Sequence, residues 1–216
     1  MSKKTANDTA SDLSEATPGQ RGPADHERRE QILSVADDLF KAHGFRKTSV
    51  TDIAREIGVS SAYLYRFFNS KQAIGEAVCA RALLSMDNAI RAVAERDQPA
   101  TQRLRDMLQT LLEEALRLFL RERRMHDIIV VSIENQWSVT EEHNRVVYET
   151  IEKIVADGRD SGEFERKTPL DEVCTAIRVT AAAYAHPVLL SRLGDPEEME
   201  TKLTAVTNLI LRSLAP

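Results

Sequence analysis

Apolar residues recur at intervals of three and four along most of the chain after residue 24, which is the period of an amphipathic α-helix. This spacing predicts a first helix over residues 25–43, two short helices between residues 50 and 69, and a long helix from residue 69 or 70 to just before Pro99. It also predicts helices over residues 101–121, 127–134 and 141–157, and two more that begin at Pro169 and near Pro196. No segment alternates with the period of two typical of strands. The pattern therefore predicts an all-α protein.

Glycine and proline mark the predicted ends of several helices. Gly44, Gly58 and Gly158 each follow an apolar helical stretch, and glycine adopts the left-handed conformation that commonly ends a helix. Pro187 is expected to end or kink the helix that begins at Pro169, because proline has no N–H to donate.

Residues 45–74 contain two short helices joined by a turn at Gly58. Ser49 is placed to cap the first, with Asp52 three residues later as the acidic partner of a capping box, and Ser60 is placed to cap the second. Two short helices joined by a tight turn form a helix-turn-helix, whose second helix can enter the major groove of DNA. The exposed residues of that second helix are expected to be Ser61, Ala62, Tyr63, Tyr65 and Arg66.

These residue types suit contact with nucleic acid. Tyrosine hydroxyls can bond phosphate oxygens, and arginine can bond phosphate or grip a guanine edge. Backbone N–H groups at a helix start also favour phosphate. For Tyr65 the alternative is a half-buried packing role. The predicted DNA-binding set is Ser49, Ser60, Ser61, Ala62, Tyr63, Tyr65, Arg66 and Lys71.

The run TSVTDIAREIGVSSAYLYRFFNSK resembles the DNA-binding signature of the tetracycline-repressor (TetR) family of bacterial transcription regulators, over about residues 30–78. The resemblance implies that Tyr65 and Lys71 contact the DNA backbone and that Tyr63 faces the bases. Phe67 departs from the family pattern, which often has a polar aromatic residue there. The matching pieces are Thr48-Ser49-Val50, Asp52-Ile53-Ala54, Gly58-Val59-Ser60, Leu64-Tyr65, Phe68 and Ser70-Lys71.

Charge is distributed unevenly along the chain. Residues 21–75 carry 9 basic and 7 acidic side chains, whereas residues 76–216 carry 18 and 24. Such asymmetry suits a small DNA-binding part on a larger body that does not bind DNA. Residues 1–24 have almost no strongly apolar side chains and are predicted to be a disordered tail. The predicted domains are therefore residues 25–75, with the helix-turn-helix at about 50–69, and residues 76–216.

The predicted body has the ingredients of a ligand pocket, which is usually apolar with a few polar groups. Each candidate could equally be an ordinary core residue. The candidate effector-binding residues are Met107, Leu111, Phe119, Ile133, Trp137, Tyr148 and Tyr184.

The resemblance implies a homodimer that binds a near-palindromic double-stranded DNA operator and is released from it by a small apolar or amphipathic effector. Small residues on the last two long helices would allow close approach between subunits. The candidate interface residues are Ala176, Thr180, Ala183, Leu203, Val206 and Ile210. The alternative is a DNA-binding module that is constitutive or controlled by a protein partner.

Other classes of function lack support in the sequence. There is no nucleophile elbow, phosphate-binding glycine loop or His-Glu-x-x-His motif, so we expect neither an enzyme nor a cofactor or metal site. His126 and His143 are expected to be solvated, and Cys79 and Cys174 to be buried free thiols. Apolar runs such as Ile128–Val131 are far too short to span a membrane, and no signal peptide is evident, so a cytoplasmic protein is expected.

Overall fold

The computed structural model describes residues 23–120, 123–190 and 192–216, without the side chains of residues 119–126, 187 and 188. The predicted tail lies outside the described residues except for its last two, which begin the first helix. The helices are α1 (Pro23–His43), α2 (Val50–Ile57), α3 (Ser61–Leu64), α4 (Lys71–Ala94), α5 (Ala100–Leu120), α6 (Arg123–Glu134), α7 (Ser138–Asp160), α8 (Leu170–Ala185), α9 (Pro187–Leu190) and α10 (Pro196–Ser213). No strand occurs among the described residues, and the predicted all-α fold is confirmed.

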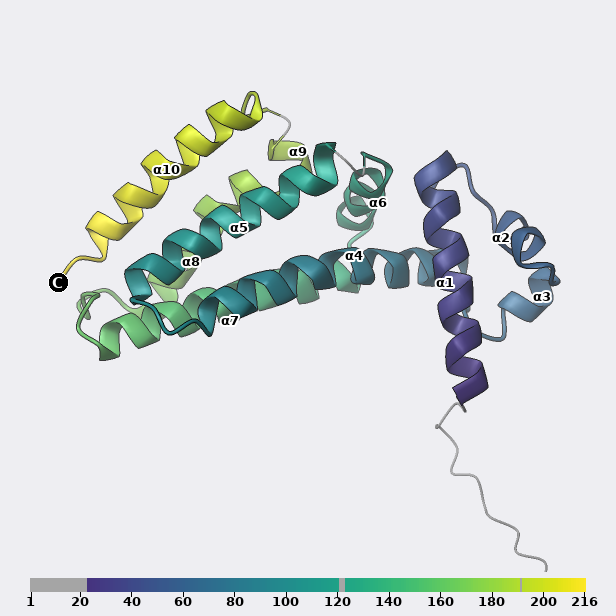
Figure 1. Ribbon diagram of the computed structural model, residues 1–216, viewed down its shortest axis with the longest axis horizontal. Helices are drawn as coiled ribbons and strands as arrows, with labels where there is room; N and C mark the ends of the chain where they lie inside the picture. The colour runs from purple at the N-terminus through teal and green to yellow at the C-terminus, as the bar shows by residue number, and fades with distance from the viewer. Residues whose placement is uncertain (1–22, 121–122, 191) are drawn as a thin grey trace, which may run out of the picture.

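The helices form two parts joined by α4 (Figure 1). We call α1–α3 the head and α5–α10 the body. The 24 residues of α4 span about 36 Å at 1.5 Å per residue, running from the head along α5 and α7. The predicted domain boundary at residue 75 falls inside this helix, so continuous hydrogen-bonded backbone crosses it.

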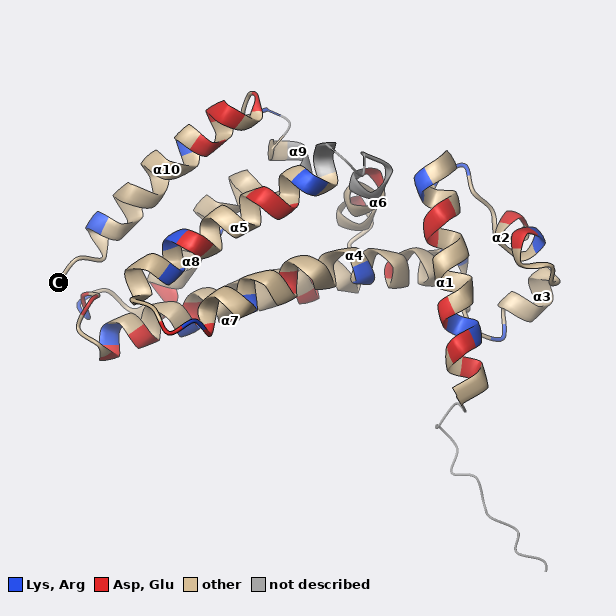
Figure 2. Cartoon of the chain, in the orientation of Figure 1, with Lys and Arg blue, Asp and Glu red and all other residues tan. Residues whose placement is uncertain are grey.

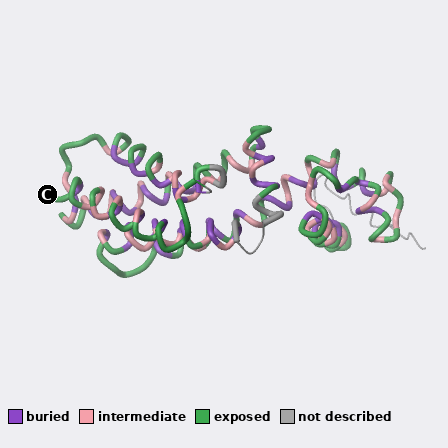
Figure 3. The backbone as a smooth tube through the Cα atoms, turned by 90° about the horizontal axis from the view of Figure 1, so that it is seen from above, coloured by how far each residue is buried: buried purple, intermediate pink, exposed green. Residues whose placement is uncertain are grey.

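The core of the body surrounds α5, which packs against α4, α7, α8 and α10. Its apolar side chains are buried around most of the helix, as expected for a helix in the middle of a bundle. Figure 3 shows the buried positions running along the inner faces of the body helices and separately through the head. The fully buried members on α5 are Leu104, Met107, Leu108, Leu111 and Leu112.

One predicted helix end is wrong. Gly158 does not end α7 but lies inside it, where a Cβ atom would be 2.2 Å from Cδ2 of Phe164. The lack of a side chain at Gly158 therefore lets Phe164 pack against α7, and the helix continues past this residue. The prediction that Pro187 ends or kinks the preceding helix is confirmed in its first form, because α8 ends at Ala185 and Pro187 begins the short helix α9. The predicted state of Cys79 and Cys174 is confirmed, since both are buried and free.

Candidate DNA-binding face and ligand cavity

The helix-turn-helix begins with a complete capping box on α2. Oγ of Ser49 accepts a hydrogen bond from the Asp52 N–H at 3.1 Å, and the Asp52 carboxylate accepts one from the Ser49 N–H at 2.9 Å. The hydrogen bond from the Ser49 hydroxyl is the main cause that lowers the pKa of Asp52. Gly58 then ends α2 in the left-handed conformation, with φ of 76°. The predicted caps of this motif are confirmed.

The short helix α3 presents a mixed face to solvent. Its N-cap, Ser60, accepts a hydrogen bond from the Tyr63 N–H at 3.2 Å. Ala62 and Arg66 are exposed, and Tyr65 is 50% exposed, which argues against the packing alternative for that tyrosine. Ser61 is half-buried and its hydroxyl donates to Thr51 Oγ1 at 3.3 Å.

Tyr63 is half-buried rather than fully exposed as predicted. Its ring centroid lies 5.3 Å from that of Phe67, and the guanidinium carbons of Arg66 and Arg28 lie 5.4 and 5.9 Å from it. These contacts place the ring next to two cations. Phe67 itself is 8% exposed, so the residue that departs from the family pattern packs in the core of the head.

A second pair of basic side chains lies where the head meets α4. Lys71, the first residue of α4, places Nζ 4.4 Å from the Phe45 ring centroid and donates to the Arg46 carbonyl oxygen at 3.4 Å. Partial burial lowers the pKa of Lys71. Arg46 forms an exposed ion pair with Glu134 of α6 at 2.7 Å. Figure 2 shows that acidic and basic residues alternate through the head, without a uniform basic coat.

Three aromatic rings, which we call the aromatic joint, connect the head to the body. Phe45 packs edge-on against Phe40 of α1 and against Trp137, with centroid distances of 5.2 and 5.4 Å. Gly75 of α4 lies against this joint, because a Cβ atom there would be 2.6 Å from Phe45 and 2.8 Å from Trp137. The joint therefore links α1, α4 and the α6–α7 turn.

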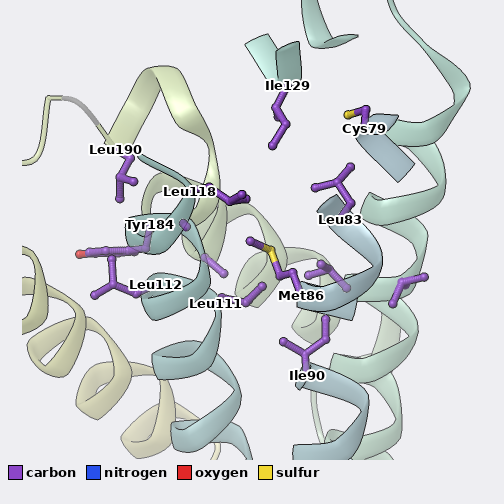
Figure 4. Packing of buried hydrophobic residues seen from close by; sticks show 14 of the residues in the cluster. Cys79, Leu83, Met86, Ile90, Leu111, Leu112, Leu118, Ile129, Tyr184 and Leu190 are labelled. Carbon is purple, nitrogen blue, oxygen red and sulfur yellow. The ribbon is translucent and has the colours of Figure 1, made fainter. Parts of the chain in front are cut away.

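A cavity of about 340 Å³ lies between α4 and the body helices α5–α8, beside α9. Figure 4 shows Leu83 and Met86 of α4 facing Leu111 and Leu118 of α5 across it. The apolar lining is Leu83, Met86, Leu111, Ala115, Leu118, Ile129, Ile133, Val147, Ala181, Ala182, Ala185 and Leu190. The polar lining is Gln136, Thr140, Glu141, His143, Asn144 and His186.

Only part of the predicted effector-binding set lines this cavity. Leu111 and Ile133 do. Met107, Trp137 and Tyr184 are instead buried core residues, with exposures of 0%, 3% and 6%. In Figure 4 the Tyr184 hydroxyl points away from Met86. Half-buried Tyr148 is absent from the lining, and the side chain of Phe119 lies outside the described residues.

The expectation that His143 is solvated is wrong. Its Nδ1 lies 2.6 Å from Oδ1 of Asp87 on α4, and the two side chains are 15% and 10% exposed. The pair joins α4 to α7 at the cavity wall. Sequence reasoning missed it because the partners are 56 positions apart. The side chain of His126 lies outside the described residues.

The predicted interface residues occupy different environments on α8 and α10. Ala176 and Thr180 are exposed, whereas Ala183, Val206 and Ile210 are half-buried. Leu203 is 3% exposed, so it is a core residue of the single subunit and we withdraw its assignment to the interface. Two apolar residues missed by the prediction are far more exposed: Val179 of α8 at 59% and Leu209 of α10 at 68%.

Known proteins resemble both parts of the chain. Residues 32–78 match the family model of bacterial regulatory proteins, tetR family, and residues 100–207 match that of the tetracyclin repressor-like C-terminal domain. The putative mycofactocin biosynthesis transcriptional regulator MftR of Mycobacterium tuberculosis is 31% identical over 164 residues, which cover 72% of this chain and 77% of MftR. The nucleoid occlusion factor SlmA of Haemophilus influenzae is 33% identical over 90 residues, and the chain spans only 41% of its length.

Solved structures share the fold over most of the chain. A TetR-family regulator from Pectobacterium atrosepticum superposes with a TM-score of 0.67 at 19% identity, covering 90% of this chain and 98% of that one. The fatty acid degradation regulator FadR from Bacillus halodurans gives 0.64 at 16% identity, covering 89% and 96%. Within the described residues, none of the helices has the length and apolar character needed to cross a bilayer. With family matches in both head and body, this chain belongs to the TetR family of DNA-binding transcriptional regulators, and the prediction that it is not an enzyme agrees with that membership.

Proposed function

We propose that this protein is a cytoplasmic, homodimeric repressor that leaves a near-palindromic operator when a small apolar or amphipathic molecule fills the body cavity. The observation that carries the proposal is the placement of α4. Leu83 and Met86 of this helix line the cavity, and Lys71 at its start lies beside the head. One rigid element therefore touches both the ligand site and the DNA-binding part.

The head would read DNA through α3 in a major groove. Tyr65 and Arg66 are exposed there, and both side chains can bond phosphate. Tyr63 packs against Phe67 beside two arginines, and its hydroxyl would contact a base edge. Lys71 at the N-terminus of α4 would hold a backbone phosphate by charge and by the helix dipole.

Exposed apolar residues on α8 and α10 support dimerisation through these helices. Val179 and Leu209 would lose contact with water in a four-helix interface, and exposed Ala176 and Thr180 are small enough to let the helices approach closely. Two heads held in this way would meet major grooves about 34–36 Å apart on one side of the duplex.

Release requires that the ligand bind more tightly to a head arrangement that fits DNA poorly, because a ligand with equal affinity for both arrangements shifts nothing. A coupling of about 1–3 kcal/mol would lower operator affinity roughly 5–150-fold. Two routes lead from the cavity to the head. One is α4, and the other is Gln136, a cavity residue with φ of 52° that directly precedes Trp137 of the aromatic joint.

The proposal is tested first by selecting fragments of the source genome with the purified protein at moderate salt. Enrichment of a near-palindromic site over random duplex, bound by two chains in light scattering, is the expected result. A monomer, or equal affinity for random duplex, would overturn it. Ligand control is tested separately with a panel of small apolar compounds, since a ligand of the folded state raises the melting temperature. An operator complex that no such compound dissociates would favour a constitutive or partner-controlled module.

A further inference from the structure

Five of the six polar residues that line the cavity lie at the α6–α7 turn and the start of α7, and the sixth, His186, directly follows α8. Thr140, His143, Asn144 and Val147 follow the spacing that places residues on one face of a helix, and all four line the cavity. Opposite them, Leu83 and Met86 of α4 and the α5 side chains supply an apolar wall. A bound molecule would therefore have an apolar part and one polar end.

The hydrogen bond between Asp87 and His143 determines what the imidazole can offer. Asp87 is 7% exposed, and its carboxylate can only accept hydrogen bonds, so we assign the proton of His143 to Nδ1, 2.6 Å away. In the neutral ring the other nitrogen, Nε2, is then an acceptor. The buried carboxylate thus fixes the tautomer in the same way that outer partners orient histidines in metal sites.

Two neighbouring side chains also present acceptors. The Thr140 hydroxyl donates its proton to the Trp137 carbonyl oxygen at 2.7 Å, which leaves only its lone pairs for a ligand. Glu141 adds a carboxylate at the cavity's exposed edge. Among the lining residues that the structure describes, none is Lys or Arg. The carboxamides of Gln136 and Asn144 can donate as well as accept hydrogen bonds. Beside them, a ligand carboxylate would meet acceptors that have no proton to give and the negative charge of Glu141, with no Lys or Arg in the described lining to offset it.

We infer that the cavity takes an apolar molecule whose polar end donates hydrogen bonds, a hydroxyl or an ammonium group, in preference to one that ends in a carboxylate. This inference rests on the proposed ligand-controlled function and names the class of its ligand. The volume of about 340 Å³ is at the lower end of ordinary ligand sites, roughly 300–1,000 Å³. A single short chain or a small ring system fits that volume.

The experiment compares three probes with the same eight-carbon chain: 1-octanol, octylammonium and octanoate. Each is titrated into the full-length dimer while the melting temperature is followed, and into the operator complex while fluorescence anisotropy is followed. We expect 1-octanol and octylammonium to raise the melting temperature and release DNA at concentrations at least tenfold below those at which octanoate acts. The relative strength of the first two distinguishes the hydroxyl from the ammonium.

Thr140→Val tests the acceptors without changing side-chain volume much. Loss of one hydrogen bond should weaken 1-octanol about five- to tenfold and leave octanoate unchanged. Glu149→Gln on the same helix is the control, because Glu149 is exposed, pairs with Arg145 and does not line the cavity. It should leave all three probes unchanged.

The outcomes separate this inference from the function on which it depends. Octanoate acting as well as or better than 1-octanol would overturn the inference and leave a ligand-controlled repressor intact. An unchanged response of Thr140→Val to 1-octanol would also overturn it. Failure of all three probes to stabilise the protein or release an otherwise specific operator complex would count against both.

Discussion

Replacing Gly75 with alanine tests whether the aromatic joint sets the orientation of the head. The added Cβ would lie 2.6 Å from Cε2 of Phe45 and 2.8 Å from Cη2 of Trp137. Both distances are too short for real contacts, so at least one ring must move. Overpacking of this kind costs about 1–3 kcal/mol, while alanine gains about 1 kcal/mol over glycine inside a helix. The net loss of stability should be about 0–2 kcal/mol.

For a domain of this size, 1 kcal/mol changes the melting temperature by about 2–4 °C. Gly75→Ala should therefore melt no more than about 8 °C below the wild type and stay folded at 25 °C. Operator affinity should fall more than this small change in stability suggests, by about fivefold or more, because the displaced rings change how the head sits on α4. Fluorescence anisotropy with a labelled operator measures the affinity.

Gly158→Ala is the matched control. It makes the same chemical change inside a helix, with a comparable clash against Phe164 and Ala100, but at a site in the body away from the head. It should lower stability and leave operator affinity unchanged. The role of the joint would be refuted if Gly75→Ala bound the operator like wild type, or if the two variants lost affinity equally.

Three further results are expected. Lys71→Ala should weaken binding to all DNA sequences alike and reduce the slope of log binding constant against log salt concentration by about one, whereas Lys71→Arg should stay close to wild type. An unchanged slope would contradict a phosphate contact by Lys71. Tyr63→Phe keeps the ring contacts and should alter discrimination among operator variants without changing the melting temperature, whereas unaltered discrimination would contradict base reading. Burial raises the pKa of Cys79 and of Cys174 from the ordinary 9.0 to about 11. The contribution of these raised pKa values to the free energy of unfolding is complete below about pH 9 and is lost as the pH rises through 11. Alkylation of both thiols at pH 8.5 should proceed only as fast as the protein unfolds. Faster labelling of the native protein would disprove that the fold protects them.

Local signals in the sequence were sufficient for the helix-turn-helix. Ser49 and Asp52 cap α2, and Gly58 ends it, because each interaction involves residues within a few positions of one another. Gly158 shows the limit of this reasoning. Its sequence neighbourhood indicates a helix end, but Phe164 returns from the following loop and needs the missing side chain, so α7 continues.

The cavity was harder to predict because its lining depends on how five long helices are rotated against one another. Helical periodicity placed Leu111 and Met107 on apolar faces of α5, yet only Leu111 faces the cavity. The rotation of α10 was mispredicted in the same way, because Leu203, which was assigned to the interface, is buried, whereas Leu209, which was not, is exposed. The Asp87–His143 pair had no sequence signal, since neither residue belongs to a recognisable motif.

The length of α4 has a mechanical consequence. Met86 at the cavity lies fifteen residues from Lys71, which is about 22 Å along the axis. Pivoting the helix by only about 5° about its cavity end would sweep Lys71 through roughly 2 Å, several times the tolerance of a hydrogen bond. Under the proposed mechanism, a ligand that tilts α4 by this small angle would therefore be enough to separate Lys71 from a bound phosphate, without melting a helix or refolding a loop.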